Sequence, residues 1–176
     1  MHSSVAPNLD ETYGAAAEPR KLDAWEKKGK VPRSLSNLDA QNALLLLDLM
    51  QLVEKGLGVV KYVFADRPIL WVVDREGNIW FALEETVDAE TGEFTYPDIR
   101  PDPGVTYDRL GHPALIGCAV GRIAGELKFD PGPPGRWYIN NFSGRYSRGN
   151  NRTEEHLNNV GAAFAKLGIE VAVQFY

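Results

Sequence analysis

The segment IAGELKF-DPGPPG-RWYINNF, residues 123–142, decides the predicted fold. Residues 123–129 and 136–142 carry Ile, Phe, Trp and Tyr, which favour β-strands. The stretch between them, residues 130–135, consists mostly of proline and glycine and is typical of a turn. We therefore predict a hairpin here and interpret the rest of the chain around it.

Four further strands are predicted outside this hairpin. Residues 59–65, 69–74 and 79–85 combine β-branched and aromatic residues, and turn-forming residues separate the three runs. This pattern predicts a β-meander. The last run, residues 169–176, predicts a final strand that follows a helix.

Two main helices are predicted. Residues 36–56 form an apolar run with a narrow polar stripe, so we expect a helix that is capped by Ser36 and buried on most sides. Residues 150–168 form a second helix with one apolar face, and either Asn151 or Thr153 is its expected cap.

Together these elements predict an α+β fold, in which an antiparallel sheet of about six strands is covered by two main helices. Residues 36–176 are expected to form this single α+β domain. Residues 1–35 are rich in small, polar and proline residues, so we expect a flexible N-terminal arm that is loosely ordered or lies along the core.

Composition limits the function classes. The formal net charge of −5 does not favour a nucleic-acid partner, which usually selects a basic surface. The single cysteine, Cys118, excludes an internal disulfide, and no Cys/His spacing indicates a metal site. No secretory signal or apolar run long enough to span a membrane is apparent, so we expect a cytoplasmic protein or one exported by a specialised secretion system. No cofactor is assigned.

The strand-to-helix turn SGRYSR, residues 143–148, carries more polar chemistry than a turn needs. A helix N-terminus offers free backbone N–H groups to an anion, and arginines bind phosphate or carboxylate bidentately. The predicted ligand-binding residues are Asn141, Ser143, Gly144, Arg145 and Arg148. The alternative is structural: these residues build the turn and cap the helix, and the arginines are solvated or paired with nearby glutamates.

Three residues are candidates for catalysis. His112 follows a long loop, Glu126 lies on a predicted strand, and Tyr146 lies in the turn. A histidine and a carboxylate are the usual general acids and bases, and the three side chains would act together if their strands are neighbours. The alternatives are a structural histidine, an exposed strand carboxylate and a packed tyrosine.

The order of four motifs resembles a known family. ILWVVDREGNIWF, GHPALIGCAVGRIAGELKF, WYINNFSGRYS and GIEVAV succeed one another over residues 69–173. This order is similar to a domain of the plant IQ-motif calmodulin-binding (IQM) proteins and to bacterial effector- and toxin-associated domains with a Ser-Gly-His-Tyr motif. Here that motif reads SGRY, with Arg145 in place of the histidine, and a His-Ser-Ser segment reads His112-Pro-Ala. The IQ motif is missing, so calmodulin binding is not implied.

The resemblance implies an effector- or toxin-type domain of bacterial antagonism or host interaction. On this hypothesis the SGRYSR turn forms a pocket for a phosphate-bearing ligand such as a nucleotide. The alternative is a non-enzymatic protein-binding module, an immunity or adaptor protein, whose partner is a toxin, an immunity protein or a host target. The acidic net charge suits such a partner.

Overall fold

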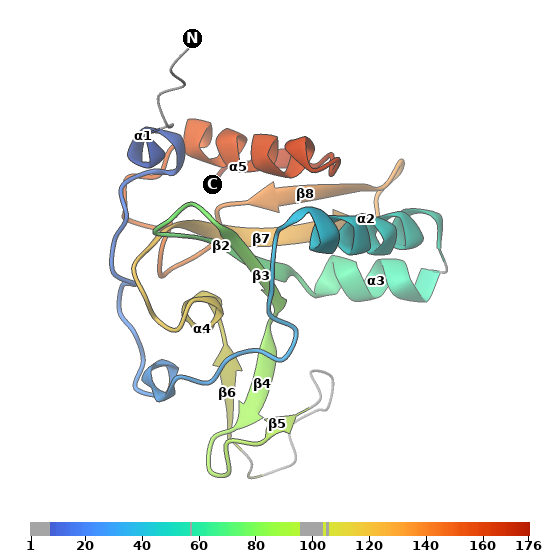
Figure 1. The fold of residues 1–176 in the computed structure, drawn as a ribbon. Helices are drawn as coiled ribbons and strands as arrows, with labels where there is room; N and C mark the ends of the chain where they lie inside the picture. The colour runs from blue at the N-terminus through green and yellow to red at the C-terminus, as the bar shows by residue number, and fades with distance from the viewer. Residues whose placement is uncertain (1–7, 57, 96–103, 105) are drawn as a thin grey trace.

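The computed structural model describes residues 8–56, 58–95, 104 and 106–176, and it shows a mixed α+β fold (Figure 1). The described strands form two sheets. The main sheet has the order β1 (Ser36–Asn37), β3 (Ile79–Leu83), β2 (Ile69–Asp74), β7 (Gly121–Asp130), β8 (Arg136–Asn140) and β9 (Ala172–Gln174). The second sheet has the order β5 (Phe94–Thr95), β4 (Glu85–Asp88) and β6 (Tyr107–Leu110).

The predicted hairpin is present and lies next to the centre of the main sheet. β7 and β8 pair antiparallel, with Leu127 opposite Ile139 and Asp130 opposite Arg136. β2 pairs antiparallel with both β3 and β7, and five of its six residues are buried. A strand with apolar residues on both faces must be covered on both sides, which explains why β2 lies inside the sheet.

The prediction of an antiparallel sheet is wrong at its edge, because β9 pairs parallel with β8. The connection between the two strands runs through helix α5 (Glu154–Lys166), and a helical crossover returns the chain in the same direction. The second sheet was also not predicted. The main sheet is therefore mixed, with one parallel pair.

Residues 59–65, predicted as a strand, belong to helix α3 (Gly58–Asp66). Val60 and Phe64 are four residues apart and both pack against the main core, which is helical spacing. The ring of Phe64 lies 5.8 Å from that of Trp137. Tertiary packing therefore overrides the strand preference of a β-branched run, and the predicted meander reduces to the β2–β3 pair.

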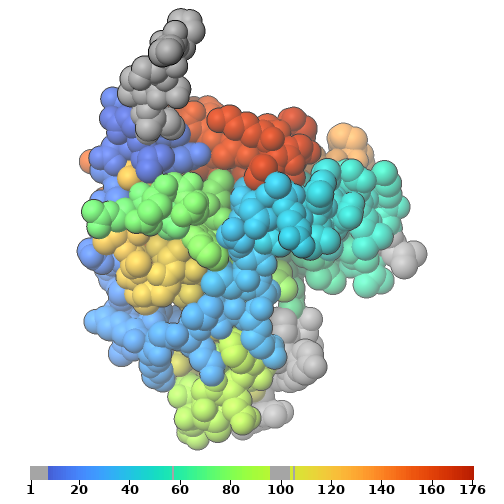
Figure 2. All heavy atoms as spheres, viewed as in Figure 1, coloured from blue at the N-terminus to red at the C-terminus, as the bar shows by residue number. Residues whose placement is uncertain are grey.

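The first long helix, α2 (Ala40–Lys55), begins later than predicted. Asp39 is its N-cap and accepts a hydrogen bond from Asn42 N at 2.8 Å, whereas Ser36 lies in β1. The helix is also less buried than predicted, because Leu44, Leu45 and Leu52 are exposed. In Figure 2 α2 (cyan) and α3 (blue-green) reach the surface side by side.

Helix α5 matches its prediction. Thr153 is the N-cap, and it forms a capping box with His156. Leu157, Val160 and Phe164 bury the apolar face of this helix. Three described helices of at least eight residues, rather than two, therefore pack with the apolar core of the main sheet: α2, α3 and α5.

The opposite face of the main sheet carries a second apolar cluster around Leu70, Val72 and Tyr146. The short helix α4 (His112–Leu115) contributes Leu115 to it. The described part of the N-terminal arm includes helix α1 (Leu9–Tyr13) and a 3-10 turn at Glu26–Lys28. This arm lies along the core, where Ala17 forms a β-bridge with Gly121. None of the helices in the described residues is long and apolar enough to cross a membrane.

Candidate functional site

The SGRYSR turn lies where β8 leaves the main sheet and the chain crosses to α5. The backbone turns tightly there, since Ser143 O accepts hydrogen bonds from Ser147 N at 3.3 Å and Arg148 N at 2.8 Å. Gly149 and Asn151 then adopt positive φ values before Thr153 caps the helix. This local geometry explains the glycine and asparagine residues of the segment.

Side chains from this segment complete the edge of β7 that β8 no longer covers. Ser147 Oγ accepts a hydrogen bond from Ala124 N at 2.9 Å and donates one to Ala124 O. Asn140 Oδ1 accepts from Glu126 N at 3.0 Å. Buried backbone groups need such partners, so these polar side chains replace a missing strand.

On the side of β8 that faces β9, the side chain of Asn141 likewise binds backbone groups. Its amide donates to Tyr176 O at 3.0 Å, and its Oδ1 accepts from Tyr176 N at 2.8 Å. Asn140 and Asn141 are both buried, and they reach toward opposite neighbouring segments. They therefore extend the sheet through side-chain hydrogen bonds on both sides of β8.

Tyr146 is a core residue. Its side chain is fully buried, and its hydroxyl donates to Ala119 O at 2.8 Å. Its ring lies so close to Gly121 that a Cβ atom at that position would approach it to 2.9 Å. Burial raises the pKa of the Tyr146 phenol well above its usual value, so the hydroxyl stays protonated. This environment suits packing and does not present the phenol to a ligand.

His112 begins α4 and is buried. Its Nε2 donates to Gly125 O at 2.8 Å, since a carbonyl only accepts. Burial lowers the pKa of His112 to about 4, although the hydrogen bond to Gly125 opposes this shift. The imidazole is therefore neutral near pH 7, and it holds α4 against β7 through a backbone contact.

Arg145 does not line the cavity that the rest of the turn forms; it faces the N-terminal arm. Its guanidinium forms ion pairs with Glu26 at 2.7 Å and with Asp23 at 2.8 Å. It also donates to the carbonyls of Arg20 and Lys21. Because two carboxylates and two carbonyls occupy these donors, the prediction that Arg145 binds a ligand anion needs correction: Arg145 fastens the arm.

Glu126 accepts a hydrogen bond from Asn140 Nδ2 at 3.1 Å. Its negative charge helps to raise the pKa of Glu84, after burial of that carboxyl as the larger cause. The three predicted catalytic residues all lie around β7, but no hydrogen bond joins their side chains in the described part of the chain. His112 and Tyr146 instead bind backbone carbonyls.

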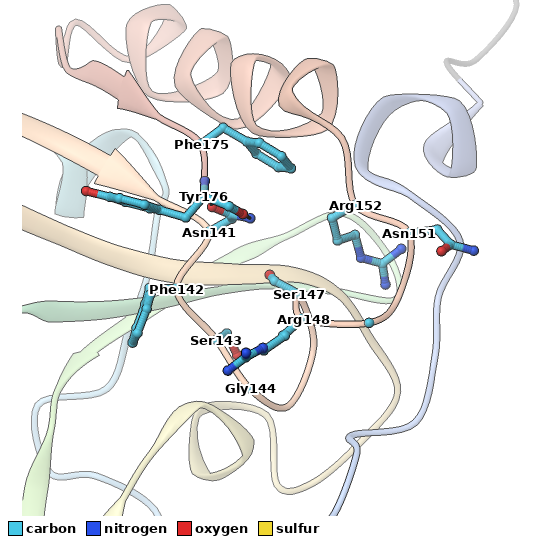
Figure 3. A pocket seen from close by; sticks show the side chains of 11 residues that line it. Asn141, Phe142, Ser143, Gly144, Ser147, Arg148, Asn151, Arg152, Phe175 and Tyr176 are labelled. Atoms are coloured by element: carbon cyan, nitrogen blue, oxygen red, sulfur yellow. Dashed lines mark hydrogen bonds between the residues drawn. The ribbon is translucent and has the colours of Figure 1, made fainter.

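A cavity of about 660 Å³ lies beside the turn, between its residues and the last residues of the chain (Figure 3). Asn141, Ser143, Gly144 and Arg148, four of the five predicted ligand-binding residues, line it. Ser147, Gly149 and Asn151 also contribute to its wall. Its size falls within the range of small-molecule sites, about 300–1,000 Å³.

Two arginines give the cavity a basic wall. Arg148 is exposed, and its side chain makes no hydrogen bond or ion pair in the part of the chain that the structure describes. Arg152 donates from Nε to Tyr146 O at 3.2 Å, whereas its Nη2 is buried without a hydrogen-bond partner among the described residues. Burial, aided by the charge of Arg122, lowers the pKa of Arg152 to about 10. The guanidinium therefore remains charged at neutral pH.

Three aromatic residues also line the cavity, and we call them its aromatic wall. Phe142, Phe175 and Tyr176 line it, and Phe142 and Tyr176 are more than half exposed. The rings of Phe142 and Tyr176 meet edge to face, with centroids 6.4 Å apart. Sequence reasoning missed Arg152 and the two C-terminal aromatics, because only the parallel β8–β9 pairing brings residues 175 and 176 to the turn.

Comparison of the chain with models of known protein families, with curated proteins and with solved structures found no match. Within the described residues, no three His, Cys, Asp or Glu side chains gather so that they could hold a metal ion. The fold and the site therefore define an α+β domain with one basic and one aromatic wall around a cavity, and the function is argued from that geometry alone.

Proposed function

We propose that the protein binds a small anionic ligand with a planar ring, such as a nucleotide, in the cavity beside the SGRYSR turn. The observation that carries the proposal is the lining of the cavity, which combines the guanidinium of Arg148, without a partner among the described residues, with three aromatic residues. A hydrogen bond to a charged group contributes about 1.5–3 kcal/mol, so a bound anion would gain about this energy from Arg148.

The basic wall supports a phosphate or carboxylate group. Arg148 is free to move toward a ligand, because no described residue holds its guanidinium. Arg152 is fixed by its hydrogen bond to Tyr146 O. One fixed and one mobile arginine suit an anion that is first oriented and then enclosed, and planar guanidinium groups bind phosphate oxygens bidentately.

The aromatic wall supports a ring. Exposed Phe142 and Tyr176 give the cavity the apolar and aromatic lining that is usual for small-molecule sites. An aromatic ring of a ligand would gain about 0.5–1.5 kcal/mol from each well-placed aromatic contact, beyond the burial of its area. A ligand that carries both a ring and a phosphate uses both walls at once.

The wider role that we propose is that of an effector- or toxin-type domain of bacterial antagonism or host interaction, and this role rests on the motif order. The alternative, a protein-binding module that acts as an immunity or adaptor protein, remains a second proposal. The buried, backbone-bound His112 and Tyr146 give no support to acid–base catalysis at the cavity. The proposal is therefore one of binding.

Thermal stabilisation by ligands tests the proposal. The wild-type protein is melted with AMP, ADP, ATP, adenosine or inorganic phosphate, because a ligand that binds only the folded state raises its stability. We expect nucleotides to stabilise the protein more than adenosine or phosphate alone. Arg148→Ala should weaken binding by about tenfold or more, since hydrogen bonds to charged groups contribute about 1.5–3 kcal/mol.

Arg136→Ala is the matched control. Arg136 is an exposed arginine in the β7–β8 hairpin, where its ion pair with Asp130 spans 3.9 Å, and it does not line the cavity. This variant should bind nucleotides as the wild type does. An absence of stabilisation by every probe at millimolar concentration, or equal effects of the two arginine variants, would contradict the proposal.

A further inference from the structure

Helix α2 turns an apolar face away from the core. Its buried residues, Ala43, Leu46, Met50 and Val53, lie on one side. Leu44, Leu45 and Leu52 lie on the opposite side and are exposed, Leu44 by 62%. Asp48 and Lys55 lie on this outer face as well, but a surface helix rarely adds three exposed leucines to its polar residues.

Helix α3 adds to this apolar face. No residue of α3 is buried. Only Lys61 and Asp66 of its nine residues are charged, and most of the other seven are large and apolar. Val59 is 74% exposed, Tyr62 is 71% exposed, and Val63 is also exposed. We call the exposed apolar side chains of the two helices the α2–α3 surface: Leu44, Leu45, Leu52, Val59, Tyr62 and Val63.

The area of the α2–α3 surface is large for a monomer. Six such side chains expose on the order of 600 Å², which is the upper end for the largest apolar patch on a typical monomer. A homodimer of standard size buries about 800 Å² on each partner. The α2–α3 surface with its polar rim is therefore large enough for one half of such an interface.

The charges on the outer face of α2 are self-complementary. Asp48 and Lys55 lie on the same side of the helix as Leu44 and Leu52, because residues about four and seven apart share a face. Neither charged side chain forms an ion pair in the part of the chain that the structure describes. They are two unpaired charges of opposite sign beside an apolar stripe.

A two-fold axis that crosses α2 between residues 51 and 52 pairs these charges. Two copies of α2 then run antiparallel, and residue 48 of each copy faces residue 55 of the other, since both are equally distant from the axis. Leu52 of each copy lies next to the axis and faces Gln51 of the other copy. Such an isologous contact uses the same patch on both subunits, as most homodimers do.

We propose that the α2–α3 surface is the interface of a symmetric homodimer, in which two α2 helices pack antiparallel and form two reciprocal Asp48–Lys55 ion pairs. Sedimentation velocity of the full chain at micromolar concentration should give twice the mass of one chain. Leu52→Glu should give a monomer, because it replaces two apolar contacts next to the two-fold axis by two like charges.

The matched control is Val31→Glu. Val31 is an exposed apolar residue of the N-terminal arm, outside both helices, and its replacement should leave the dimer intact. Circular dichroism and melting temperature check that all variants fold, which we expect because the replaced side chains are exposed. A monomeric wild type, or a dimer that Leu52→Glu does not weaken, would overturn the proposal.

A charge exchange tests the antiparallel arrangement separately. Asp48→Lys and Lys55→Asp should each weaken self-association by about tenfold, since like charges then face each other twice. A mixture of the two variants should form a heterodimer, because both facing pairs are again of opposite sign. If the mixture associates no better than either variant alone, the proposed arrangement is wrong; restored association would exclude a surface built for an unrelated partner.

Discussion

Replacement of Arg145 by alanine should destabilise the protein by about 3 kcal/mol, because the side chain fastens the arm and its loss leaves Glu26 without its cation. The carboxylate of Glu26 is 5% exposed and binds the Arg145 guanidinium at 2.7 Å. Removal of one partner from a buried ion pair costs about 3–5 kcal/mol, and partial exposure of Arg145 reduces this to about 2–3 kcal/mol. The exposed Asp23 pair adds about 0.5 kcal/mol.

Urea denaturation measures this loss, and hydrogen exchange locates it. Amides of the arm that bind the core, at Ala17 and Arg20, should exchange faster in Arg145→Ala, whereas those of β2 should not change. Combination with Glu26→Gln should recover part of the stability, because the double variant buries no unpaired charge. A loss below about 0.5 kcal/mol with unchanged arm protection, or nucleotide binding that disappears in a fully folded Arg145→Ala protein, would refute the assignment of Arg145 to the arm.

Three further predictions concern the turn and β7. Gly125→Ala should lower the free energy of unfolding by more than about 3 kcal/mol, because its Cβ would lie 1.7 Å from a backbone carbonyl oxygen of β8. Gly144→Ala has open space around it and should leave the free energy of unfolding, measured by urea denaturation, unchanged. Ser147→Ala should lower the free energy of unfolding by about 2–3 kcal/mol, because it leaves the buried N–H and C=O of Ala124 unpaired. Ser143→Ala loses one long hydrogen bond of 3.4 Å and should lower it by about 1 kcal/mol or less. Equal losses in the two variants would contradict these roles. The pKa of His112 is about 4 in the folded state and about 6.5 in the unfolded state, so folding favours the neutral imidazole. The contribution of His112 to the free energy of unfolding is therefore complete above pH 6.5 and declines by about 3 kcal/mol as the pH falls to 4. Urea denaturation of His112→Gln over this range should show a shallower pH dependence; an unchanged slope would show that the histidine is not the cause.

The elements that sequence alone predicted correctly are those whose local signals agree with their packing. The β7–β8 hairpin has strand-forming residues on both sides of a Pro/Gly turn. Helix α5 has a cap at Thr153 and three apolar residues at helical spacing. Helix α3 failed because its β-branched composition favours a strand, and only its packing against β7 and α2 decides the outcome.

The candidate site divides in the same way. The turn at residues 143–148 was identified because it holds more polar residues than its geometry needs, and the cavity does lie beside it. The role of Arg145 depends on Glu26, which lies more than a hundred residues earlier, so no local pattern indicates that ion pair. The aromatic wall likewise depends on the parallel pairing of β9 with β8. The order of strands along the chain does not determine which strands pair or in which direction.

The most direct test of the proposed function is isothermal titration calorimetry of the wild-type protein with AMP and with adenosine. The cavity has a basic wall at Arg148 and Arg152 and an aromatic wall at Phe142 and Tyr176, so AMP should use both. We predict one AMP bound per chain, with adenosine at least tenfold weaker and AMP binding reduced in Arg148→Ala. Absence of AMP binding, or equal affinity for AMP and adenosine, would contradict the account.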